Sequence, residues 1–118
     1  MLIIYNNLCR LTRHYGDGGL KVLHLISGGD SGGAKTHVLS LLHDLNKSIS
    51  ADLVCFMEGE FSHEAEERGI PVTVFDGGFP VAYKKTKDMI EGGGYDIVHC
   101  HGSRANLMGS LLKGHFDL

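Results

Sequence analysis

Residues 21–45 constrain the fold of this chain more than any other stretch, because they combine a strand, a glycine-rich turn and a helix. Lys21–Ile26 is an apolar run with the length of a buried strand. Residues 27–33 hold four glycines, which let the backbone turn sharply. Apolar residues then recur at helical spacing, at Val38, Leu41, Leu42 and Leu45. A helix that opens on such a turn directs unpaired backbone N–H groups towards the loop, so we predict an anion-binding site there rather than a simple connection.

Known phosphate-binding loops provide a test of this prediction. The dinucleotide fingerprint requires glycines at positions i, i+2 and i+5, and no set of glycines in this turn has that spacing. Residues 29–36 (GDSGGAKT) match the P-loop pattern, except that Ala34 replaces the second glycine. Residues 72–76 (VTVFD) could then supply the partner strand that ends in a metal-binding aspartate. A P-loop-like nucleotide-binding domain therefore stays open as an alternative.

The rest of the chain alternates between strand and helix patterns. The predicted strands are residues 21–26, 52–57, 72–75 and 96–100. The predicted helices follow the glycine turn and then span residues 62–68, residues 81–91 and a last segment from Ser103 onwards. This alternation is typical of βαβ units with parallel strands. We predict an α/β fold with a Rossmann-like, doubly wound parallel sheet of four strands in the order 3-2-1-4, counted from Lys21.

This strand order makes the first and fourth predicted strands neighbours. The loop at residues 28–36 follows the first of them, and the turn at residues 99–104 follows the fourth. Doubly wound sheets bind ligands at the carboxyl ends of such a strand pair, where the strand order reverses. Both loops are therefore predicted to open onto one crevice.

Three segments resemble the N-terminal half of family 4 glycosyltransferases, which have the GT-B fold. They are KVLHLISGGDSGGAKTHVLSLLHDL at residues 21–45, RGIPV at residues 68–72 and YDIVHCHGSRANLMGSLL at residues 95–112. Their order and spacing also fit that family, and Ala34 is expected in its GGA turn. The resemblance implies that residues 21–118 form a truncated, partial N-terminal Rossmann-like domain of a GT-B enzyme, and that residues 1–20 lie outside it.

The resemblance also implies an activity: transfer of a sugar, with retention, from a nucleotide-diphosphate sugar to a glycan, lipid or small-molecule acceptor. Neither a cofactor nor a bound metal is implied. Four residues would lie on the donor diphosphate side: Gly32, Gly33, Ala34 and Lys35. Five residues would line the acceptor-side cleft: His99, His101, Gly102, Ser103 and Arg104.

Two features of the resembled family have no counterpart in this sequence. Its donor site lies mostly in a C-terminal domain, and an important histidine follows the strand after residues 96–100. Because neither is matched, no catalytic residue is assigned here. The chain alone is expected to be inactive and to need the missing C-terminal GT-B domain as its partner.

His99 and His101 form an H-x-H pattern at the end of a predicted strand. Side chains two residues apart on a strand point the same way, and such a pair can bind zinc. Two ligands are too few for a metal site, and no nearby aspartate or glutamate obviously completes it. No metal is therefore predicted.

Charge and cysteine content exclude further classes of function. A formal net charge of −3 argues against nucleic-acid binding through phosphate contacts. Cys9, Cys55 and Cys100 are odd in number and form no C-x-x-C pair, which favours reduced thiols. We predict a cytoplasmic protein. An alternative is that the full-length enzyme lies at the inner face of the membrane. We also predict a homo-oligomer, because apolar surface is expected to be exposed where the missing parts of the enzyme would pack.

Residues 1–20 contain an apolar LIIY segment followed by a polar stretch that ends in turn residues. We expect a gene-boundary artefact or a weakly packed tail, with an extra strand at a sheet edge as the alternative. A non-catalytic Rossmann-like module that binds a nucleotide or a protein partner also stays open as a function for the whole chain.

Overall fold

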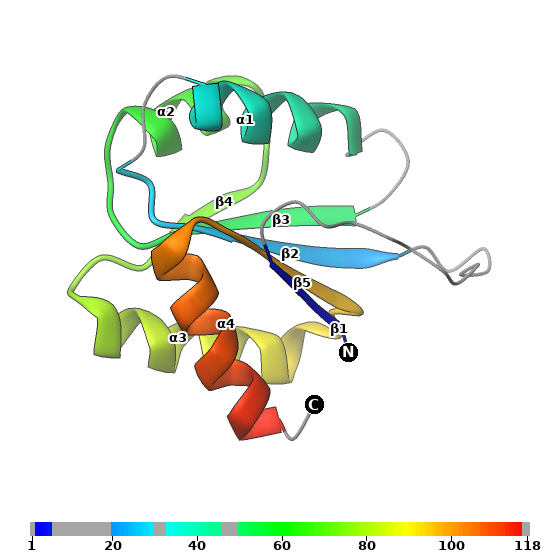
Figure 1. Ribbon diagram of the computed structural model, residues 1–118. Helices are drawn as coiled ribbons and strands as arrows, with labels where there is room; N and C mark the ends of the chain where they lie inside the picture. Colours follow the sequence, from blue (N-terminus) through cyan, green and yellow to red (C-terminus); the bar gives the residue numbers. More distant parts are fainter. Residues whose placement is uncertain (1, 6–19, 30–32, 46–49, 117–118) are drawn as a thin grey trace.

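The computed structural model describes residues 2–5, 20–29, 33–45 and 50–116, and it shows a parallel sheet between two layers of helices (Figure 1). Its elements in chain order are β1 Leu2–Tyr5, β2 Lys21–Ile26, α1 Gly33–Leu45, β3 Ser50–Cys55, α2 Glu60–Glu67, β4 Val72–Val74, α3 Phe79–Gly93, β5 Ile97–His101 and α4 Ser103–Phe116. Helices α1 and α2 cover one face of the sheet, and α3 and α4 cover the other. The predicted alternation of strands and helices is confirmed.

The sheet contains five strands in the order β1-β5-β2-β3-β4, and every neighbouring pair is parallel. The run β4-β3-β2-β5 reproduces the predicted order 3-2-1-4, so the predicted fold class is confirmed. Strands β2 and β5 lie side by side in the middle of the sheet, with His24 opposite His99 and Ile26 opposite His101.

Strand β1 differs from the preferred expectation for the start of the chain. Leu2 pairs with Ile97 and Tyr5 pairs with Cys100, which places β1 along the outer edge of β5. The expectation of a weakly packed tail is therefore wrong for Leu2–Tyr5, and the alternative of an added edge strand describes this segment. The open edge of β5 offers unpaired backbone groups, and the apolar LIIY segment satisfies them. Residues 6–19 lie outside the described part of the chain.

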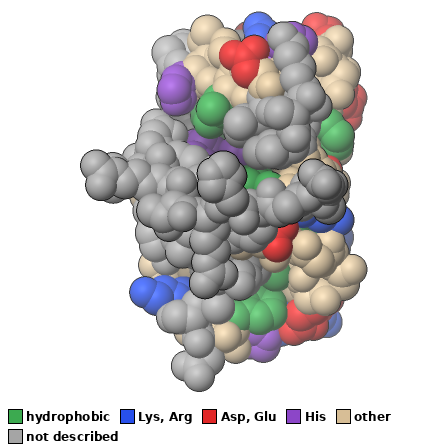
Figure 2. All heavy atoms as spheres, turned by 90° about the vertical axis from the view of Figure 1, so that its right-hand side faces the viewer, with side chains coloured by type: hydrophobic (Ala, Val, Ile, Leu, Met, Phe, Trp, Pro, Cys, Tyr) green, Lys and Arg blue, Asp and Glu red, His purple; other side chains and the backbone are tan. Residues whose placement is uncertain are grey.

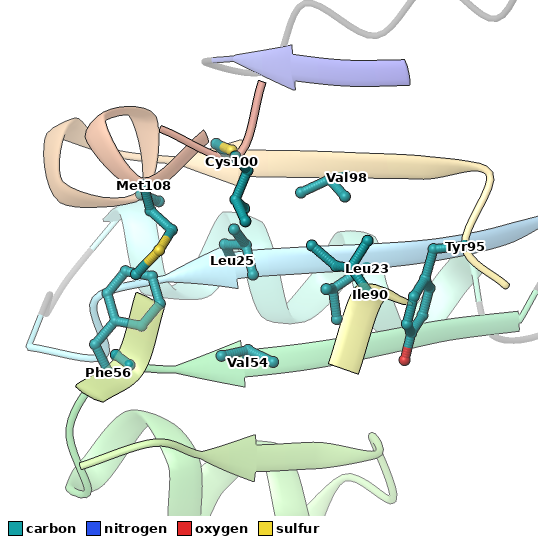
Figure 3. Packing of buried hydrophobic residues seen from close by; sticks show 12 residues of the cluster. Leu23, Leu25, Val54, Phe56, Ile90, Tyr95, Val98, Cys100 and Met108 are labelled. Atoms are coloured by element: carbon teal, nitrogen blue, oxygen red, sulfur yellow. The ribbon is translucent and has the colours of Figure 1, made fainter. Parts of the chain in front are cut away.

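One hydrophobic cluster fills the space between the sheet and the layer formed by α3 and α4 (Figure 3). Because side chains alternate along a strand, β2 directs Leu23 and Leu25 to this side. The other members are Val54, Phe56, Ala82, Ile90, Tyr95, Val98, Cys100, Ala105, Met108 and Leu112. This cluster anchors α4, whose first turn lies at the carboxyl end of β5.

A second hydrophobic cluster lies under α1 and α2. Its members are Ile26, Val38, Leu39, Leu42, Ala51, Leu53, Cys55, Phe61, Ala65 and Ile70. Val38 and Leu42 come from the apolar face that the sequence predicts for α1, whereas buried Leu39 is not part of that prediction and Leu41 is only partly buried. Burying this face fixes the start of α1 next to the end of β2.

Hydrogen bonds join the amino ends of the central strands. The backbone N–H of Lys21 donates to Asp96 Oδ2 at 3.0 Å, and the N–H of Asp96 donates to the Lys21 carbonyl at 2.8 Å. The Tyr95 hydroxyl donates to Asp52 Oδ2 at 2.6 Å, and burial together with this bond raises the pKa of Tyr95. Figure 2 looks onto this end of the molecule, where the visible described hydrophobic side chains form separate small patches.

Glycines end two helices where the sequence predicts stops. Gly69 follows α2 with φ 74°, and Gly94 caps α3 with φ 66°, a left-handed conformation that glycine adopts without strain. Helix α3 begins at Phe79 rather than at residue 81, because Pro80 fits the first turn of a helix. Within the described chain, every helix falls short of the length and apolarity needed to cross a membrane.

Deletion of residues 1–5 should lower the melting temperature by several degrees, a loss of about 1–2 kcal/mol in the free energy of unfolding. The reason is that β5 loses the backbone pairing on its outer edge. The exposed edge should then pair with other copies of the chain. Thermal unfolding and size-exclusion chromatography at several concentrations measure both effects. An unchanged melting temperature together with unchanged elution would show that β1 contributes nothing to the sheet.

Candidate functional site

The carboxyl ends of β2 and β5 meet at the centre of the sheet, where Ile26 and His101 are register partners. From this point the chain leaves β2 towards α1 on one face and leaves β5 towards α4 on the other (Figure 1). Ligands bind doubly wound sheets where the connections diverge in this way. The structure therefore brings the two predicted loops to the same edge of the sheet.

The turn after β2 requires glycine at position 28. Gly28 is buried and has φ 92°. A Cβ atom there would lie 2.8 Å from the Met57 carbonyl oxygen and 3.2 Å from the Cβ of Cys55. The backbone N–H of Phe56 also donates to the Ser27 carbonyl at 3.0 Å. The turn is thus held against the end of β3, and this contact sets the direction in which the chain enters α1.

The predicted donor-side residues lie at the start of α1. Gly33, Ala34 and Lys35 form its first turn, whereas Gly32 lies outside the described residues. The first backbone N–H groups of a helix have no partner within the helix, and its dipole gives this end a partial positive charge. The first turn of α1 can therefore bind an anion through its backbone.

The predicted acceptor-side residues divide into an exposed and a buried group. Gly102 has φ 91°, and Gly102, Ser103 and Arg104 are exposed. Ser103 and Arg104 begin α4, and the N–H of Asn106 donates to the Gly102 carbonyl at 2.9 Å. A second helix start with an exposed guanidinium therefore faces the same edge as α1.

His99 and His101 belong to the buried group, with 3% and 5% of their surface exposed. They lie on the α1 face of the sheet, because Cys100 between them faces α4. His24 from β2 is fully buried beside them, and its Nδ1 lies 2.9 Å from His101 Nε2, a hydrogen bond. The rings of His99 and His101 have centroids 4.1 Å apart. The three imidazoles form one cluster directly beneath the site.

The histidine cluster is held in the neutral form. Burial lowers the pKa of His24 well below its ordinary value, and the neighbouring His101 and His99 lower it further. Burial and the nearby His37 of α1 lower the pKa of His99 to about 4. Burial, His99 and His37 lower the pKa of His101 to about 3. At neutral pH the cluster therefore adds no positive charge to the site.

His24 is a member of the cluster that no motif in the sequence indicates. The H-x-H pattern marks His99 and His101 as a pair that lines the acceptor-side cleft, whereas the structure buries both. His24 interrupts an otherwise apolar strand, and that interruption is the one signal that marks it as unusual. Its position opposite His99 depends on the register of two strands that are distant in sequence.

A shallow pocket on α2 includes none of the residues at the carboxyl ends of β2 and β5. It is lined by Glu60, His63, Glu64 and Glu67. Three carboxylates in one lining repel a phosphate group rather than bind it. The carboxyl edge of β2 and β5 is therefore the better candidate for an anionic ligand.

The sequence matches no protein-family model and no curated protein. The fold is similar to that of Alr3699/HepE from Anabaena. For its complex with UDP and glucose, the TM-score is 0.67 and the identity is 23% over 80% of this chain. For its complex with UDP-glucose, the TM-score is 0.68 and the identity is 22% over 80% of this chain. It is also similar to that of the lipopolysaccharide outer core galactosyltransferase WaaB in its apo form (TM-score 0.59, 15% identity, 81% of this chain).

These similarities confirm the fold that the sequence resemblance predicts, that of part of a GT-B glycosyltransferase. The chain spans 27% of the Alr3699/HepE chain in the first complex and 30% of the WaaB chain, so it corresponds to a limited part of each. The donor-side and acceptor-side assignments stay predictions.

Replacing Gly28 with alanine should lower the free energy of unfolding by about 2 kcal/mol or more, because the added Cβ meets the Met57 carbonyl and the backbone keeps a positive φ. Gly114→Ala is the matched control, since nothing lies within 4 Å of its added Cβ. Its stability should be unchanged or slightly higher, because alanine favours a helix. Urea denaturation compares the two. Equal stability of both variants would contradict the requirement for glycine at position 28.

The free energy of unfolding should decrease as the pH is lowered. The measurement uses protein treated with a chelator, which removes any bound metal. Unfolded histidine has a pKa of 6.5, whereas folded His99 and His101 have values of about 4 and about 3. Because the pKa values are lower in the folded protein, the contribution of these histidines to stability is fully present above pH 6.5. It is lost as the pH falls from 6.5 through about 4 for His99 and about 3 for His101. Each such histidine contributes up to about 1.4 kcal/mol per pH unit in that window. Urea denaturation at pH 7, 6 and 5 measures the slope, which His101→Leu should reduce and His43→Leu should not.

Proposed function

We propose that this chain forms the acceptor-side part of a retaining glycosyltransferase that uses a nucleotide-diphosphate sugar. The observation that carries the proposal is the fold similarity to Alr3699/HepE, whose crystal structures contain UDP, glucose or UDP-glucose. The divergence of the connections at the carboxyl ends of β2 and β5 supports the proposal, because doubly wound sheets bind ligands at such a point.

The donor diphosphate binds at the start of α1 in this proposal. Gly32 and Gly33 let the phosphate approach the backbone, and the N–H groups of Ala34 and Lys35 donate to it. The negative charge that develops on the leaving diphosphate is then stabilised by fixed backbone dipoles. This arrangement requires no metal at the phosphate.

The acceptor, a glycan, a lipid or a small molecule, binds beside the start of α4. Ser103 and Arg104 are exposed there and can donate hydrogen bonds to hydroxyl or phosphate groups. The buried His99 and His101 support this wall from beneath instead of contacting the acceptor directly. The acceptor-side role predicted for the two histidines thereby becomes one of positioning.

The whole enzyme supplies a second domain across the crevice in this proposal, because catalysis needs groups on both sides of the reacting phosphate. With one wall only, the phosphate contacts lie in open water and are weak. Leu107 and Leu111 on α4 are 55% and 45% exposed, and they are candidates for contact with that domain or with a second copy. Free, buried Cys55 and Cys100 fit the reducing cytoplasm, where we place the protein.

The P-loop alternative loses support from the sheet order. Its metal-binding aspartate would be Asp76, which follows β4. Strand β3 separates β4 from β2, so the two ends are about 10 Å apart at a spacing of about 4.8 Å per strand. Asp76 therefore does not lie beside the glycine turn. A non-catalytic module remains the second candidate, and nucleotide binding alone without a role in transfer would favour it.

Titration of the chain with UDP, followed by two-dimensional NMR, tests the proposal. We expect a dissociation constant of about 1 mM, or about −4 kcal/mol, with shifts concentrated in residues 33–35 and 102–104. Gly33→Val should weaken binding at least about fivefold, because a bulky side chain blocks the approach of the phosphate to the backbone. Gly114→Val on α4 is the control and should bind as the unmodified chain does.

Uridine and magnesium–ATP complete the design. Uridine lacks the diphosphate and should cause no shifts at residues 33–35. Tighter binding of magnesium–ATP than of UDP would support the P-loop alternative. Equal UDP affinity in Gly33→Val, or shifts confined to other parts of the chain, would overturn the proposed donor site.

A further inference from the structure

Three histidines converge at the seam between the two central strands. His24 of β2 and His99 of β5 are register partners, and His101 follows two residues later on the same face. Their side chains are 0%, 3% and 5% exposed. They lie between the small apolar cluster of Leu20, Val22 and Ile97 and the larger cluster under α1. A polar group in such surroundings requires partners for its ring nitrogens.

The ring nitrogens are close enough to bind one ion. One nitrogen from each of the three rings can be chosen so that all lie within 4.8 Å of one another. Tetrahedral zinc with Zn–N bonds of about 2.0–2.1 Å separates its nitrogen ligands by about 3.3 Å. The 2.9 Å between His24 Nδ1 and His101 Nε2 is already near this value. The other nitrogen pairs, which lie within 4.8 Å, must shorten to this value by rotation of the imidazole side chains.

Hydrogen bonds within the cluster satisfy only some of its ring nitrogens. The His24–His101 bond satisfies one nitrogen of each ring, but the Nε2 atoms of His24 and His99 are buried without a hydrogen-bond partner among the described residues. Imidazole binds a metal in its neutral form, through the lone pair of one ring nitrogen. Hydrogen bonds between the three histidines therefore do not explain why His99 is buried in the cluster. Ligation of a metal ion by all three rings does explain it.

We propose that His24, His99 and His101 bind a zinc ion between β2 and β5. Three imidazoles favour zinc and other late first-row metals over Mg²⁺ and Ca²⁺, which prefer oxygen ligands. Water completes the tetrahedron, as in other three-histidine zinc sites. The ion links the two central strands just below the carboxyl edge. This site is independent of nucleotide-sugar binding.

Zinc titration of the full chain after chelator treatment tests the site at pH 7.5. Equilibrium dialysis with elemental analysis should give one zinc per chain, with a dissociation constant below about 1 μM. The melting temperature should rise by about 10 °C when free zinc is about 100 times that constant. Cobalt in place of zinc should give the intense visible absorption of a tetrahedral nitrogen-ligated ion.

Two variants and a matched control distinguish ligation from folding. His99→Gln removes one ligand, and His24→Leu replaces a buried imidazole with an apolar side chain of similar size. Both should keep the circular dichroism spectrum of the chelated protein and should bind zinc at least about 100-fold more weakly. His43→Gln, on the exposed side of α1, should bind as the unmodified chain does. UDP titration in chelator should be unaffected by His43→Gln.

Three results would overturn the site. The first is zinc binding of unchanged affinity in both His99→Gln and His24→Leu. The second is an equal loss of binding in His43→Gln, which would indicate adsorption to surface histidines. The third is the absence of a zinc-dependent change in melting temperature in the unmodified chain. A zinc site that persists without UDP binding would leave this inference intact and would count against the proposed function alone.

Discussion

The parallel pairing of β2 with β5 is the contact on which the rest of the molecule depends. It joins a strand from the first quarter of the chain to one near its end, with Lys21 and Asp96 bonded at the amino ends. Both hydrophobic clusters are built on this pair, since Leu23 and Val98 face one helix layer and Ile26 faces the other. Without it, the turns that follow the two strands would not meet at one edge.

Local patterns made much of the fold predictable. The apolar run of β2, the glycine turn and the helical spacing of α1 are each contained within a few residues, so the sequence alone indicates them. The place of β1 was not predictable in the same way, because a four-residue apolar segment pairs only if an open strand edge is available to it. The strand order was predicted as that of a doubly wound sheet, the arrangement that alternating strands and helices favour.

The exposed residues of the candidate site were predictable from the sequence, and the buried histidines beneath them were less so. Gly102 and Arg104 lie at the carboxyl edge, as their position after a strand indicated. The partnership of His24 with His101 depends on strand register, and register is a property of the assembled sheet. The site is consequently two layers of different chemistry: exposed helix starts that attract anions, and neutral imidazoles below them that carry no charge at neutral pH.

The position of β5 between β1 and β2 has a consequence for how the protein is made. Leu2 pairs with Ile97, so β1 cannot pair until the chain has been synthesised as far as β5. At about 5–20 residues per second, this delay lasts roughly 5–20 s. Throughout that interval the LIIY segment is an apolar strand with no sheet to join, and the edge of β2 that receives β5 is also open. Strand β1 is therefore synthesised well before its partner, and the nascent chain exposes two unpaired strand edges until β5 has been made.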